Sequence, residues 1–160
     1  MRTIFLLLYT TCCSIIACSP QKGTVEVDSL SRKVFESLRE NDFSKVREII
    51  PNKSGFEKIY TMQGFTGDVD AAFSTFLHQC ESDFDSMYNT YNGWSNAVYI
   101  NTNEVQEKSD KVMMAELTTK IEIDGVVKKI SFNGAKVGGR WYYYSNLHWL
   151  QQDTSTVTTR

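Results

Sequence analysis

The chain has 160 residues, of which 41% are hydrophobic and 22% charged, and its formal net charge at pH 7 is -2. This length is enough for one domain that buries about two-thirds of the surface of its unfolded chain. The near balance of 17 basic and 19 acidic side chains excludes the strongly basic surface that nucleic-acid-binding proteins present, so we expect no nucleic-acid partner.

The first eighteen residues have the layout of an export signal. Met1 and Arg2 give a short positive start, residues 3–16 are mostly apolar, and Cys18 closes the segment. As a helix, the apolar stretch would span only about 21 Å, which is short of the ~30 Å hydrocarbon core of a bilayer. We therefore expect residues 1–17 to be a signal peptide that is removed.

The closing tetrad Ile15-Ile16-Ala17-Cys18 resembles a bacterial lipobox, in which signal peptidase II cuts before the cysteine and acyl chains such as palmitate are attached to it. The resemblance implies a lipoprotein of the bacterial cell envelope that is held in the lipid bilayer through acylated Cys18. Ser19, in place of an acidic residue, implies the outer membrane. The alternatives are an ordinary signal peptide that is cut nearby and a buried apolar strand.

Cysteine usage agrees with export. Cys12 and Cys13 would leave with the signal peptide and Cys18 would be acylated, so Cys80 would be the one thiol of the folded part. We therefore expect no disulfide within the domain.

Helical periodicity dominates the first half of the chain. It predicts helices over 26–40, over 43–50 up to Pro51, and over 69–91, the longest of them. Glycines interrupt the segment 52–67, for which we expect a loop that contains one short helix or strand. The residues 18–24, which include a polar run with two helix breakers, are expected to form a tether.

A period of two replaces the helical pattern after Trp94. It predicts strands over 97–101, 113–123, 126–134 and 140–150, with hairpin turns at Asp124-Gly125 and Gly138-Gly139. We expect an α+β domain over 25–150, in which three N-terminal helices pack on a curved four-stranded antiparallel sheet and the longest helix covers one sheet face. The polar residues 151–160 are expected to be a disordered tail.

This order of elements resembles the cystatin-like cone of the nuclear-transport-factor-2-like and SnoaL-like superfamily. From the segment 35–43 onward the chain is also similar to small envelope lipoproteins of Bacteroides-type bacteria, and Gly138-Gly139-Arg140-Trp141-Tyr142-Tyr143 and Leu147-His148-Trp149 resemble their final hairpin. The resemblance covers residues 30–150 and implies a fold and a location. It implies no activity, because this superfamily includes enzymes and adaptors alike.

Groups with catalytic or metal-binding chemistry are few. His78, Glu81 and Asp85 share one face of the long helix, but the pattern favours a solvated face over a metal site, and we expect neither a metal nor a cofactor. Cys80 lies on the apolar stripe and is expected to be an inert core residue. The segment 63–67 resembles the inhibitory loop of cystatins, but it precedes a helix and does not turn a hairpin. We identify no catalytic residue.

The aromatic residues of the last strand are the stronger functional signal. Alternation places Trp141, Tyr143 and Trp149 on one face, which we expect to be core. It places Tyr142, Tyr144 and His148 on the other face, which we expect to bind a ligand or a partner.

Two functions remain open at this point. The leading hypothesis is a membrane-anchored, non-enzymatic module that binds a small ligand or another envelope protein. The alternative is a SnoaL-like isomerase or hydrolase with its site inside the cone. An empty cone with a buried His or carboxylate beside a tyrosine hydroxyl would favour the enzyme, whereas a filled cone would favour the binding module.

Overall fold

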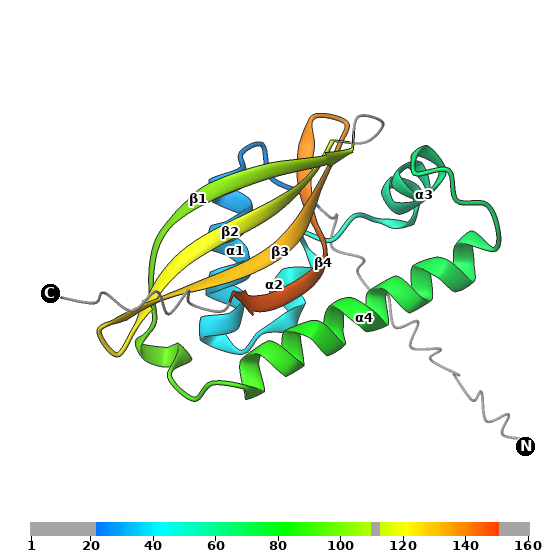
Figure 1. Ribbon diagram of the computed structural model, residues 1–160. Helices are drawn as coiled ribbons and strands as arrows, with labels where there is room; N and C mark the ends of the chain where they lie inside the picture. The colour runs from blue at the N-terminus through cyan, green and yellow to red at the C-terminus, as the bar shows by residue number, and fades with distance from the viewer. Residues whose placement is uncertain (1–21, 110–112, 151–160) are drawn as a thin grey trace, which may run out of the picture.

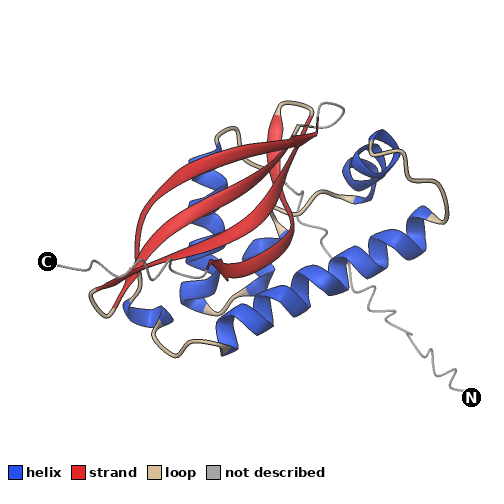
Figure 2. Ribbon diagram, viewed as in Figure 1, coloured by secondary structure: helices blue, strands red, loops and turns tan. Residues whose placement is uncertain are grey.

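The computed structural model describes residues 22–109 and 113–150 of the chain. Within them, four α-helices precede a four-stranded antiparallel sheet of strand order β1-β2-β3-β4, as Figures 1 and 2 show. The predicted α+β class is confirmed. The elements are α1 (Val27–Glu40), α2 (Phe43–Arg47), α3 (Lys53–Met62), α4 (Val69–Asn89), the 3-10 turn η1 (Trp94–Asn96), β1 (Val98–Ser109), β2 (Met114–Ile123), β3 (Val126–Val137) and β4 (Arg140–Leu150).

The helix α3 makes the number of helices four where the sequence predicted three. Asn52 caps it, because its side chain accepts a hydrogen bond from the Gly55 amide at 2.8 Å. Phe56 and Ile59 are buried on its inner face. A glycine inside a helix costs about 1 kcal/mol relative to alanine, whereas burying one large apolar side chain contributes about 1.5–3 kcal/mol. Burial therefore outweighs the glycine that made this segment look like a loop.

Several other element boundaries differ from the prediction; β3, for example, ends at Val137 and not at residue 134. The second helix ends at Arg47 and not at residue 50. The first strand runs to Ser109 and not to residue 101. Its second half has a polar sequence without apolar alternation, and it is a strand because it pairs with β2 as far as Met114. The β2–β3 hairpin turns at Asp124-Gly125 as predicted, and both residues have positive φ angles, of 52° and 77°.

The inner face of the sheet packs on α1, which crosses behind the strands in Figure 1. We expected the long helix in that position. Instead α4 runs beside β4, the last strand of the sheet. The core between α1 and the sheet is made of fully buried apolar side chains, among them Leu30, Val34, Leu38, Leu117, Ile121, Ile130 and Phe132.

The free edge of β4 is covered along its length. Trp141 exchanges two backbone hydrogen bonds with Thr24, and the Tyr143 amide donates to the Ile49 carbonyl at 2.9 Å. Farther along, the Asp83 side chain of α4 accepts from the Asn146 amide at 3.0 Å. These contacts satisfy backbone groups that an open edge strand would offer to another chain.

The domain begins earlier than predicted. The Lys22 amide donates to the Glu48 carbonyl at 3.0 Å, and Thr24 pairs with Trp141, so residues 22–24 of the expected tether are part of the fold. The predicted signal peptide, Cys18 and the predicted tail over 151–160 lie outside the described residues. Among the described residues, no helix combines the length and the apolar character that crossing a membrane requires.

Candidate functional site

The faces of β4 alternate as predicted at its two ends, although the strand is irregular between them. Two register shifts each insert one extra residue in β4 relative to β3, so that Tyr142 pairs with Ala135 and His148 with Ser131. Because the two insertions cancel, Tyr142 and His148 stay on the outer face. Trp141 and Tyr143 are buried in the core, as predicted.

Tyr144 is the residue that the first register shift displaces. Its ring packs against Phe76 of α4, with ring centroids 5.2 Å apart, and against Phe56 of α3 at 6.3 Å. Its hydroxyl donates to Oε1 of Gln63 at 3.4 Å. Burial raises the pKa of this phenol above its ordinary value. Tyr144 thus holds α3 and α4 against the sheet and is only partly accessible to a partner.

Tyr142 and His148 contact two other parts of the molecule. A Cβ atom added to Gly23 would lie 2.7 Å from the Tyr142 ring, so this tyrosine lies directly against the N-terminal segment of the fold. The Nδ1 atom of His148 lies 2.8 Å from the Asn146 carbonyl oxygen. Both side chains are half-buried. The three residues that we predicted to form one binding face therefore line three separate environments.

The interior of the cone is filled where an enclosed site would have to lie. Tyr143 is 1% exposed and its ring packs 5.7 Å from that of Phe132, which is completely buried. Burial raises the pKa of Tyr143 well above its ordinary value, so the phenol stays protonated at neutral pH. Its hydroxyl makes no hydrogen bond of standard geometry among the described residues, although the Leu147 backbone interacts with it and lowers the pKa against the effect of burial. The buried polar group therefore faces packed side chains.

The three side chains that the sequence offered as possible metal ligands are exposed or paired with a neighbour. His78 and Asp85 are exposed, and Glu81 lies 3.6 Å from the guanidinium of Arg47. Within the described part of the chain, no group of three or more His, Cys, Asp or Glu side chains is placed to hold a metal ion. The face is thus solvated, as predicted.

Cys80 is buried as predicted, and its thiol donates to the Tyr144 carbonyl at 3.7 Å. Burial raises the pKa of the thiol far above its ordinary value, so it does not form the reactive thiolate at neutral pH. Gln63, at the start of the segment that resembles a cystatin loop, caps the end of α3, and its amide donates to Sδ of Met114.

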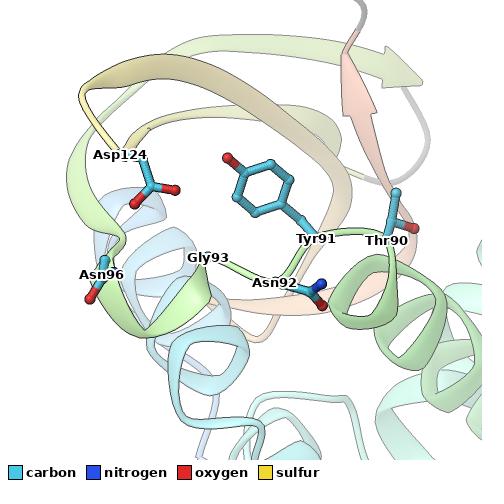
Figure 3. A pocket seen from close by; sticks show the side chains of 6 residues that line it. All are labelled: Thr90, Tyr91, Asn92, Gly93, Asn96 and Asp124. Atoms are coloured by element: carbon cyan, nitrogen blue, oxygen red, sulfur yellow. The ribbon is translucent and has the colours of Figure 1, made fainter.

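An open cleft lies at the opposite end of α4 from α3, and the sequence did not reveal it. It has a volume of about 440 Å³ and is lined by Thr90, Tyr91, Asn92, Gly93, Asn96 and Asp124 (Figure 3). Five of these residues follow the end of α4, and Asp124 belongs to the β2–β3 turn. We name it the Asp124 cleft.

Close packing at Gly93 holds the two walls of the cleft together. A Cβ atom at this position would lie 2.5 Å from Cε1 of Tyr91, 2.7 Å from Cγ2 of Ile123 and 3.2 Å from Oδ2 of Asp124. Such distances are shorter than van der Waals contact, so only glycine fits without displacing a neighbour. Because Gly93 has no side chain, the loop after α4 lies directly against the β2–β3 turn.

The aromatic ring of Tyr91, which lines the cleft, packs against a pair of stacked tryptophans. Trp94 is buried and stacks on Trp149 at 5.4 Å between ring centroids, and the Tyr91 ring lies 6.0 Å from Trp149. The ammonium group of Lys128 lies 4.7 Å from the centroid of the Tyr91 ring. The indole of Trp94 also donates to the Tyr88 carbonyl at 3.2 Å, which ties the stack to the last turn of α4. Tyr91 thus has a fixed support.

The lining of the cleft suits hydrogen bonding more than catalysis. The lining residues carry two amides, two hydroxyls and one carboxylate; Figure 3 shows the Tyr91 hydroxyl and the Asp124 carboxylate within the open space, and the Thr90 hydroxyl donates to the Ser86 carbonyl at 2.5 Å. In the sequence, Asn92-Gly93 and Asp124-Gly125 were helix-end and turn signals, and no motif connected them. Only the fold brings these two segments together.

A second cavity of about 170 Å³ lies between α1 and α2 and is lined by Lys33, Glu36, Lys45 and Glu48. Lys45 forms an ion pair with Glu40, which raises the pKa of the ammonium group and lowers that of the carboxyl. Charges of both signs alternate around this cavity, and we regard it as a solvated groove between neighbouring helices.

Comparisons with protein-family models, with curated proteins and with solved structures found no match for this chain.

Proposed function

We propose that this protein is a lipid-anchored protein of the bacterial cell envelope whose single domain is a non-enzymatic binding module. The proposed anchor is Cys18 with attached acyl chains, and the proposed location is the outer membrane. The pattern of residues 1–18 supports the anchor. The fold supports it too, because Lys22 is already hydrogen-bonded into the domain and leaves only a short segment between Cys18 and the fold.

The packed interior is the observation that carries the binding role. In a cone-shaped enzyme the reacting groups need space between the helices and the sheet, where here Tyr143 and Phe132 are in contact. Within the described residues, the Asp124 cleft offers a ligand an open space outside this packed core. A SnoaL-like isomerase or hydrolase was the alternative, and the filled interior favours the binding module over it.

Tyr142 and His148 are two further proposed contact positions on the outer side of β4, each in its own environment. Both are half-buried and keep part of their side chains accessible. Tyr144, which the sequence grouped with them, contributes mainly to the packing of α3 and α4. A protein partner at this face would therefore be sensitive to substitution of Tyr142 and His148 with little loss of stability.

Membrane fractionation of the Cys18→Ser variant tests the anchor, and Cys13→Ser is the matched control inside the signal peptide. We expect the wild-type and control proteins to require detergent for extraction and to incorporate labelled palmitate. The Cys18→Ser protein should incorporate no label and should no longer be found as processed protein in the membrane fraction. Unchanged labelling and extraction of Cys18→Ser would contradict the proposal.

A further inference from the structure

We propose that the Asp124 cleft binds a carbohydrate, with one hexose or N-acetylhexosamine unit seated between the loop after α4 and the β2–β3 turn. This inference deepens the proposed function by naming the class of ligand. Its support comes from the chemistry of the lining, its charge, its aromatic wall and the way in which it is built.

The lining side chains match hydroxyl groups in number and kind. The amides of Asn92 and Asn96 and the hydroxyl of Tyr91 can each donate and accept hydrogen bonds. The Thr90 hydroxyl, which donates to the Ser86 carbonyl, and the Asp124 carboxylate can accept them. A sugar hydroxyl also donates and accepts. A ring of neighbouring hydroxyls can therefore satisfy this lining without leaving a polar group unpaired, and unpaired groups are what weaken polar binding.

The charge of the lining argues against other ligand classes. Asp124 is the one charged side chain among the six lining residues, so an anion would meet the repulsion of its carboxylate beside the attraction of the Lys128 ammonium group at Tyr91, and the cleft offers it no site of one sign. A cationic ligand would compete with Lys128, whose ammonium group already lies over the Tyr91 ring. An apolar ligand would bury the two amides without hydrogen-bond partners. A neutral polyhydroxylated ligand avoids all three costs.

Tyr91 gives the cleft the apolar wall that a sugar ring requires. A pyranose has a face of C–H groups, which packs favourably on the electron-rich face or edge of an aromatic ring. Tyr91 is half-exposed and rests against Trp149. Figure 3 shows its ring within the cleft, with the hydroxyl end directed toward the side that carries Asp124.

The cleft is built before a ligand arrives. Its volume of about 440 Å³ lies within the range of about 300–1,000 Å³ that small-ligand sites occupy. Trp94, which is 2% exposed, and the close approach at Gly93 fix the loop, and the hairpin turn fixes Asp124. A ligand therefore orders few side chains on binding, which lowers the entropic cost that limits weak sugar complexes.

The test is a titration of the full-length protein with a panel of saccharides, followed by NMR of the backbone amides. The panel contains glucose, galactose, mannose and N-acetylglucosamine as methyl glycosides, together with maltose, cellobiose and lactose. A zwitterionic detergent keeps the chain soluble, because a glycoside detergent would itself occupy the site. We expect saturable shifts confined to the amides of residues 90–96 and 124–125, with at least one of these sugars.

Two variants with matched controls identify the site. Asp124→Asn removes the charge and keeps a residue that tolerates a positive φ. Its control, Glu122→Gln, removes the charge of an exposed side chain on β2, two residues before Asp124 and outside the lining. Asn96→Ala is paired with Asn101→Ala, which is exposed on β1. We expect the two cleft variants to weaken binding by about tenfold each, since a charge-assisted or paired hydrogen bond is lost, and the controls to bind as wild type.

Three results would overturn the inference: no saturable shift in the cleft with any sugar of the panel, shifts centred elsewhere on the domain, or equal affinity in cleft and control variants. These outcomes are independent of the anchor. Cys18→Ser is read by palmitate labelling and extraction, so the carbohydrate site can fail while the proposed envelope lipoprotein stands, and the reverse also holds.

Discussion

Replacing Tyr143 by phenylalanine tests the filled interior directly, because it removes one buried oxygen and keeps the ring. The Tyr143 hydroxyl is inaccessible and makes no hydrogen bond of standard geometry among the described residues, with only the Leu147 backbone acting on it. A buried polar group without a partner costs about 1–3 kcal/mol, and Tyr143→Phe relieves that cost while preserving the contact with Phe132. We expect the free energy of unfolding to rise by about 1 kcal/mol, and the Tm to rise by about 3–5 °C for a domain of this size.

Urea and thermal unfolding followed by circular dichroism measure the change. Tyr144→Phe is the matched control, because its hydroxyl is partly accessible and donates to Gln63 at 3.4 Å; its effect should stay within about 0.5 kcal/mol. A loss of 1 kcal/mol or more in Tyr143→Phe would refute the reasoning. Such a loss would mean that the hydroxyl is hydrogen-bonded inside the cone, either to the Leu147 backbone or to water, and only a bond to water in a polar space would return support to the enzyme alternative.

Three further substitutions or reactions test other parts of the structure. Trp141→Ala should destabilise the domain by about 3–5 kcal/mol in urea unfolding, and a loss below 1 kcal/mol would show that this side chain is not core. Cys80 should react with a thiol reagent only after denaturation, and rapid labelling of the native protein would show that this thiol is on the exposed face of α4 and not on the buried one. Gly93→Ala should cost about 1–3 kcal/mol and should shift the amide signals of the Asp124 cleft, because the added Cβ meets Tyr91 and Ile123; unchanged spectra would contradict the packing of the cleft.

Hydrophobic periodicity was sufficient to predict the long helices and the sheet, and insufficient where tertiary contacts determine local structure. For 52–67 the glycines predicted a loop with one short helix or strand, and the helix α3 forms because Phe56 and Ile59 are buried in the core. The second half of β1 has no apolar alternation and depends on its pairing with β2. The prediction that α4 covers a face of the sheet was wrong, and α4 lies beside β4. An amphipathic stripe does not indicate whether a helix covers the face or the edge of a sheet.

The candidate site was predicted less well than the fold. Alternation placed Tyr142 and His148 correctly, but only because two inserted residues cancel, and it gave no sign that Tyr144 packs against α3 and α4. The Asp124 cleft joins a loop after α4 to a hairpin turn far along the chain. Its residues are ordinary turn formers in sequence, so no spacing or motif distinguishes them before the fold brings them together.

Intact mass spectrometry of the protein extracted from cell membranes tests the central claim of a lipid-anchored envelope protein most directly. We predict a chain that lacks residues 1–17 and carries the added mass of acyl chains on Cys18, with fragmentation assigning the modification to that residue. An unmodified chain in the membrane extract, or a mature N-terminus at a residue other than Cys18, would contradict the account.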